Sequence, residues 1–345
     1  MQPIAFMDNN AQRNSNIELL RLILMLFIVI HHGIVYGAGL IELKTNVVDN
    51  ILPIDLYSYG IVNSFLVFSV NSFLLISGFF GIKPNRQKII SLIITVLFYH
   101  ILFSILYNIL IGASMKTILL SLFVFSCTPY WFVFFYIFLC YFAPMLNDFF
   151  KDVPQKKQNK FILMLLVGSC YFGFVWNNKI NLDGYTLFQF FMVYSIGRYL
   201  SLHTINLSKV KCISIYLLSV LIVVVIYCSL IKYGLYRYAW KIFFYNNPLV
   251  LLSSVVIFLL FRKVHFQSKA VNNISKSALA IYLFQNSRFC ETVYYNYIKE
   301  YYSQVGGLTT IILIIMLSVI ISILSILIDR IQLIINKRLL FLISK

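Results

Sequence analysis

The stretch "NIELLRLILMLFIVIHHGIVYGAG", residues 16–39, is almost wholly apolar, yet it carries Arg21 near its start and the pair His31 and His32 near its end. It is long enough to cross the ~30 Å hydrocarbon core of a bilayer as a helix. Each ionisable side chain in hydrocarbon costs on the order of a few kcal/mol, so such residues need a partner or a function. The sequence therefore predicts a membrane-spanning helix with three polar residues to explain.

The composition of the whole chain is that of an integral membrane protein. Of the 345 residues, 61% are hydrophobic and 11% are charged, whereas about a quarter of the residues of a soluble domain are charged. Windows of roughly 19 residues predict an all-α, polytopic protein with about ten spans, and residues 1–345 form one membrane domain with a short N-terminal tail, residues 1–15. The predicted spans are 17–38, 58–81, 88–112, 129–149, 160–177, 185–201, 211–232, 246–262, 274–296 and 307–334.

The distribution of basic residues predicts the orientation. Of the 28 Lys and Arg residues, 19 lie in the N-terminal tail, around the loops after even-numbered spans, or at the C-terminal end. Short basic loops stay in the cytoplasm, so both termini are expected there. Helical spans indicate a cytoplasmic (inner) membrane, because outer-membrane proteins are barrels. The net charge of +17 follows from this topology and from the scarcity of acidic residues, without a nucleic-acid partner.

Arg21 and His32 are expected to share one face of the first helix. They are eleven positions apart in the sequence, so they lie ~20° apart around the axis and ~16 Å apart along it. His31 points away from that stripe, and Glu18 is placed for an i, i+3 ion pair with Arg21. One interpretation is that the Arg21 side chain snorkels to the cytoplasmic lipid headgroups. The alternative is a reaction path in which His32 acts as a general base or nucleophile near neutral pH.

Other polar and aromatic residues also allow two interpretations. Gln285 and Arg288, one helical turn apart in the ninth span, are expected to face the same way, either as contacts between helices or as part of a site. Trp131 belongs to the interfacial aromatic belt or stacks on a sugar ring at the outer mouth. The six cysteines have no C-x-x-C spacing, so no metal site is expected.

Four stretches together resemble the membrane-bound acyltransferase 3 family, which O-acylates surface glycans and other extracytoplasmic acceptors. "IELLRLILMLFIVIHH" resembles the family's first helix, with a basic residue and a histidine separated by ten residues. "FLLISGFFG", residues 73–81, resembles its Ser-Gly-aromatic end of the second helix. "YWFVFFYIFLCYFAPMLN", residues 130–147, is similar to its Trp-Phe opening and later Pro-x-Leu. "ALAIYLFQN", residues 278–286, resembles its Ile-Tyr-Leu stretch.

One residue departs from the family pattern. The Ile-Tyr-Leu stretch is often followed by a histidine, and here that position is Gln285. The contribution of that histidine must be absent or supplied by another group. The chain is also too short for the fused SGNH-type domain of some relatives, so it resembles the stand-alone form.

The resemblance implies an O-acetyltransferase of a bacterial cell envelope. Its partners would be acetyl-CoA as donor, a surface glycan or lipid-linked oligosaccharide as acceptor, and the bilayer, with no permanently bound cofactor; an oligomer is possible. Arg21 and His32 would be catalytic. The acyl group would pass either directly from the donor to the acceptor or through an intermediate in which it is bound to His32. Arg21, Lys83, Arg86 and Lys88 would bind the donor, and Ser77, Trp131, Gln285 and Arg288 would stabilise the oxyanion or bind the acceptor. The alternative function is a transporter or flippase of a lipid-linked glycan.

Overall fold

The structure is a computed structural model that describes residues 14–46, 48, 51–112, 114–116, 119 and 130–343, with side chains as far as residue 336. The predicted tail, residues 1–15, lies almost wholly outside the described residues. Every regular element in the described ranges is helical. The elements are α1 (Ser15–His32), η1 (Gly33–Gly37), η2 (Leu40–Lys44), α2 (Pro53–Ser64), α3 (Ser69–Phe80), α4 (Arg86–Ile111), α6 (Trp131–Asp152), α7 (Gln155–Leu166), η3 (Val167–Val175), η4 (Lys179–Asn181), α8 (Leu187–Leu202), α9 (Lys209–Lys232), α10 (Tyr236–Lys241), α11 (Pro248–Arg262), α12 (Lys269–Ile274), η5 (Ser275–Ser277), α13 (Ala278–Gln285), α14 (Arg288–Cys290), η6 (Glu291–Tyr295), α15 (Asn296–Val305) and α16 (Gly307–Ile343).

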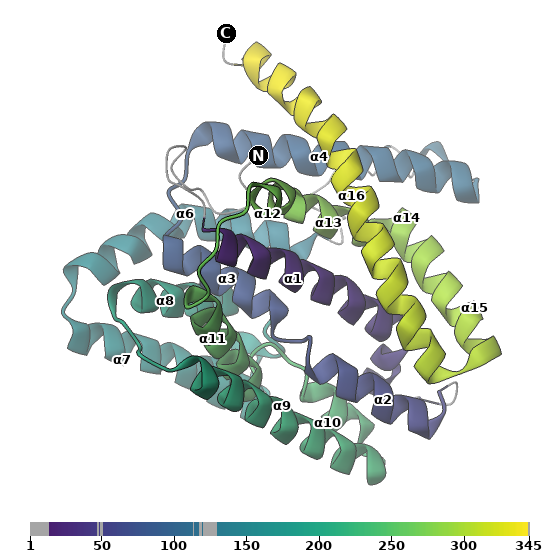
Figure 1. Cartoon of the computed structure of the whole chain (residues 1–345), viewed down its shortest axis with the longest axis horizontal. Coiled ribbons are helices and arrows are strands. Elements are labelled where there is room, and N and C mark those ends of the chain that lie inside the picture. The colour runs from purple at the N-terminus through teal and green to yellow at the C-terminus, as the bar shows by residue number, and fades with distance from the viewer. Residues whose placement is uncertain are drawn as a thin grey trace.

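Helix α1 runs through the middle of the bundle (Figure 1). It packs against α3, α11, α12, α13 and α16. The segments Ser15–Gly37 and Pro53–Phe80 are the most buried of the long apolar helices, whereas fewer than a third of the residues in the most apolar parts of α4, α6, α9 and α16 are buried. The polar residues of α1 are therefore shielded from lipid by neighbouring helices, which is the arrangement that intramembrane charges require.

Seven segments in the described residues are long and apolar enough to cross a membrane, and they correspond to seven of the ten predicted spans. The predicted spans 185–201 and 246–262 are the shorter helices α8, of 16 residues, and α11, of 15 residues. The predicted span 274–296 is not one helix, because it is divided among α12, η5, α13, α14 and η6. The protein is thus an all-helical, multi-pass type of membrane protein.

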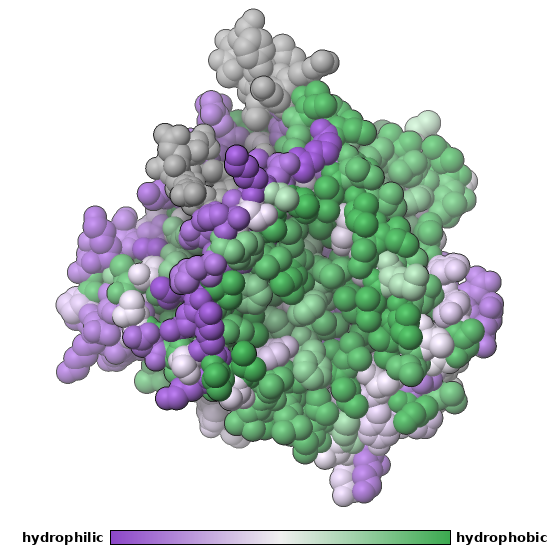
Figure 2. All heavy atoms as spheres, in the orientation of Figure 1, coloured by the Kyte–Doolittle hydropathy of each residue, from purple (hydrophilic) through white to green (hydrophobic). Residues whose placement is uncertain are grey.

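The surface has the distribution expected of such a protein. Figure 2 shows hydrophobic residues over most of the middle of the visible face and hydrophilic residues gathered mainly along its left side. At that side α6 turns into α7 and α8 leads to α9 (Figure 1). Lysines are frequent in these connections, among them Lys151, Lys156, Lys157, Lys209 and Lys211. We call this the basic end of the bundle.

Two facing glycines let α3 and α8 approach closely. A Cβ atom on Gly78 would collide with the backbone of Tyr194, and one on Gly197 would collide with the backbone of Leu75 and lie 2.9 Å from the Gly78 Cα atom. Small residues at a helix crossing are how membrane helices gain close packing. The glycine of the Ser-Gly-aromatic stretch is thereby explained by packing.

Gly78→Ala is expected to destabilise the fold by about 1–3 kcal/mol, because backbone on the opposite helix cannot move aside for the added methyl group. Thermal unfolding of the purified protein measures the effect. Gly168→Ala is the matched control, because its added methyl group meets only the ring end of Phe188. Equal melting temperatures for the wild type and Gly78→Ala would contradict the role of this contact.

Candidate functional site

One cavity reaches into the bundle beside α1. The empty space among its lining residues is about 660 Å³, a figure that includes open solvent. Its walls come from α1, α3, α6, α13 and the turn before α11. The lining residues are Arg21, Met25, Ile28, His32, Val70, Phe73, Ser77, Trp131, Phe132, Tyr245, Ala278, Leu279 and Tyr282.

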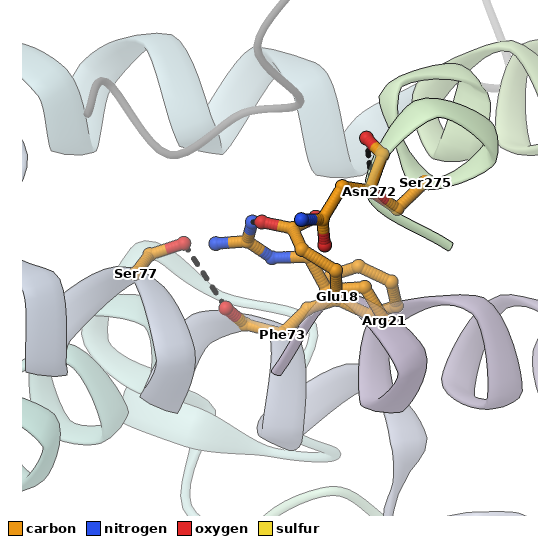
Figure 3. Close-up of polar contacts among 6 residues, drawn as sticks. All are labelled: Glu18, Arg21, Phe73, Ser77, Asn272 and Ser275. Atoms are coloured by element: carbon orange, nitrogen blue, oxygen red, sulfur yellow. Dashed lines mark hydrogen bonds and ion pairs between the residues drawn. The ribbon is translucent and has the colours of Figure 1, made fainter. Parts of the chain in front are cut away.

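Arg21 is held in the cavity wall by Glu18. Its Nη1 atom lies 2.7 Å from Glu18 Oε1, and both side chains are almost completely buried. The expected i, i+3 ion pair is therefore present. Figure 3 shows the Arg21 guanidinium extending past Glu18 toward the part of α3 that carries Ser77. Because guanidinium has five N–H donors, this pairing leaves donors for a ligand in the cavity.

His32 contacts the end of α13. Its Nδ1 atom lies 2.9 Å from Oε1 and 2.7 Å from Nε2 of the Gln285 amide, which is fully buried. When Oε1 accepts from Nδ1–H, the Nε2 atom of His32 is left unprotonated and able to accept a proton; when the amide Nε2 donates to Nδ1, the proton of His32 is on its Nε2 atom instead. The Gln285 amide therefore fixes the His32 ring, and the direction of this hydrogen bond sets which ring nitrogen is basic.

His31 belongs to the structural core. Its Nδ1 atom lies 2.5 Å from Oδ1 of Asn63, and the ring is buried and does not line the cavity. The adjacent histidines thus have different surroundings: His31 binds an amide of α2, and half-buried His32 lines the cavity.

The expectation that Gln285 and Arg288 share a face is wrong. Helix α13 ends at Gln285, and α14 begins at Arg288 after two non-helical residues. The Ser287 hydroxyl caps the new helix by accepting from Cys290 N–H at 3.2 Å. This break turns Arg288 outward, so its side chain is exposed and does not line the cavity, whereas Gln285 stays buried.

Ser77 lines the cavity, but its hydroxyl is engaged, donating to the Phe73 carbonyl at 3.0 Å (Figure 3). The cations of the loop after α3 lie outside the cavity lining. Lys83 and Arg86 are exposed and Lys88 is half-buried.

An aromatic wall borders the cavity: Trp131 and Tyr245 line it, and Tyr185 packs against both. The ring centroid of Tyr185 lies 4.6 Å from that of Trp131 and 4.7 Å from that of Tyr245. Tyr245 belongs to a non-helical turn whose carbonyl accepts from the side-chain amides of Asn71, at 2.8 Å, and Gln189, at 3.0 Å. Irregular backbone at membrane depth needs such partners, and here they hold the Tyr245 ring in place.

Sequence reasoning missed Tyr245 and Tyr282 as lining residues. Tyr282 is the tyrosine of the Ile-Tyr-Leu stretch, one helical turn before Gln285, so its position carried a signal. Tyr245 carried none, because its contacts with Asn71 and Asp183 join segments far apart in the sequence.

Comparison with known proteins identifies the family of the chain. A family model described as the acyltransferase domain of acyltransferase 3 matches residues 14–328. No curated protein and no solved structure matches the chain. The matched region contains every residue that lines the cavity. Because the match covers most of the chain, the chain belongs to the acyltransferase 3 family.

Proposed function

We propose that the protein is an O-acetyltransferase of the cytoplasmic membrane that moves an acetyl group from cytoplasmic acetyl-CoA to a hydroxyl of a surface glycan or a lipid-linked oligosaccharide. One observation carries the proposal: Arg21 and His32 line the same cavity, and Gln285 holds the His32 ring. A cation in the cavity can bind an anionic acyl donor, and a base in the same cavity can deprotonate the acceptor hydroxyl.

The donor enters from the basic end. Helix α1 starts near it, because the Asn16 amide donates to the carbonyl of Phe261 at 2.8 Å, near the end of α11, and Lys263, just after α11, donates to Asn206 of the connection between α8 and α9 at 3.5 Å. With basic loops in the cytoplasm, Arg21 is nearer the cytoplasm and His32 is deeper. Arg21 receives an anionic or polar part of acetyl-CoA, and the exposed Lys83 and Arg86 attract its phosphates from solution. The acyl-pantetheine arm then extends along the mostly apolar wall toward His32.

The acceptor approaches from the opposite side, over the aromatic wall of Trp131, Tyr185 and Tyr245. Aromatic faces offer large, rigid apolar area with polar edges, which fits a sugar ring. His32 Nε2 takes the proton of the acceptor hydroxyl as its oxygen attacks the acyl carbon. A prior transfer of the acyl group to His32 would use the same nitrogen.

His32→Ala is expected to lower turnover by about 100-fold or more, because it removes the proton acceptor. The assay uses the protein in nanodiscs with radiolabelled acetyl-CoA and surface glycan extracted from the native host, and it records both label transfer and released CoA thiol. His265→Ala, at an exposed histidine outside the cavity lining, is the control. Transfer that survives in His32→Ala, or a folded wild type without transfer, would overturn the proposed function.

Gln285→Leu is expected to lower kcat by about tenfold or more, because Nδ1 loses the amide that holds the His32 ring in place. Gln285→Glu keeps an oxygen acceptor at that place and should retain more activity than the leucine variant. The same transfer assay compares the two. A leucine variant as active as the wild type would show that Gln285 does not orient His32.

A further inference from the structure

Tyr282 carries an unsatisfied hydroxyl at the cavity. The residue is 7% exposed and lines the cavity, and its phenol oxygen is buried without an acceptor for its proton among the described residues. A buried tyrosine hydroxyl normally finds a partner, because leaving it unpaired is costly. This hydroxyl is therefore available to a ligand.

The position of Tyr282 on α13 puts it beside the catalytic histidine. It precedes Gln285 by three residues, so the two side chains leave the same side of the helix about 4.5 Å apart along its axis. Gln285 contacts His32 Nδ1 directly. Ala278, one turn before Tyr282, lines the cavity as well. One face of α13 thus presents Tyr282 to the space that His32 borders.

The two oxyanion donors expected from the sequence, Ser77 and Arg288, are placed less well than Tyr282. The Ser77 hydroxyl already donates to Phe73, and Arg288 is exposed outside the cavity lining. Among these three, Tyr282 alone combines a place in the wall with a proton to donate.

We propose that Tyr282 donates a hydrogen bond to the carbonyl oxygen of the bound thioester and to the oxyanion formed from it, an inference that rests on the proposed function. The acceptor oxygen bonds to the acyl carbon while His32 Nε2 takes its proton, and the carbonyl π electrons move to the oxygen facing Tyr282. When the tetrahedral intermediate collapses, the carbon–sulfur bond breaks. The thiolate of CoA leaves with the proton from His32, and Tyr282 keeps its own proton throughout.

The direct test is the infrared spectrum of acetyl-CoA carrying ¹³C at the acetyl carbonyl, bound to the protein in nanodiscs without an acceptor. A hydrogen bond from Tyr282 weakens the carbonyl bond, so the bound thioester should absorb at lower frequency than the free one. Tyr282→Phe should remove this shift. The matched control is Tyr130→Phe, because Tyr130 is a buried neighbour whose hydroxyl donates to the Leu283 carbonyl instead of lining the cavity.

Kinetics provide the second readout. Tyr282→Phe should lower kcat by about 100-fold, as loss of one oxyanion donor does, with the Kd of acetyl-CoA changed by less than about threefold. An unchanged carbonyl frequency or an unchanged kcat in Tyr282→Phe would overturn the inference and leave the proposed function standing. Equal losses in Tyr282→Phe and Tyr130→Phe would assign both tyrosines to packing. A folded wild type that binds no acetyl-CoA would overturn both the inference and the function on which it rests.

Discussion

The ion pair between Glu18 and Arg21, buried in an otherwise apolar bundle, constrains the helices around it. A pair of this kind is tolerated only when its remaining hydrogen-bonding atoms have partners or face a polar space. Helix α1 therefore lies at the centre, with α3, α11, α12, α13 and α16 packed against it. Arg21 also lines the cavity, so an anionic or polar group that enters it can accept from the guanidinium.

The helix that meets His32 is short. A continuous ninth span would present an uninterrupted apolar surface, but α13 ends at Gln285 and the chain resumes at Arg288. Discontinuous helices at membrane depth are characteristic of binding sites, because their ends bring polar groups into the bilayer. Here the last residue of α13 reaches His32, and the tyrosine one turn earlier faces the cavity.

Regular helical geometry explains what the sequence could predict. Because α1 is helical from Ser15 to His32, the spacing of Arg21 and His32 was sufficient to place both on one wall. Positions set by irregular or distant contacts were beyond such reasoning. The outward turn of Arg288 depends on a break capped by Ser287, and the place of Tyr245 depends on amides from α3 and α8. The spans that correspond to α8 and α11 were predicted in place and close to their observed lengths of 16 and 15 residues.

The most direct test of the account is acetyl-CoA binding by the protein in nanodiscs, measured by calorimetry for the wild type and for the double variant Glu18→Gln/Arg21→Gln, which removes the cation without leaving a buried carboxylate unpaired. Charge-assisted hydrogen bonds from Arg21 predict that the double variant binds at least about tenfold more weakly, while Arg237→Gln, at an exposed arginine of α10, binds like the wild type. Equal affinity of the wild type and the double variant, or no binding by a folded wild type, would contradict the claim that Arg21 receives the acyl donor.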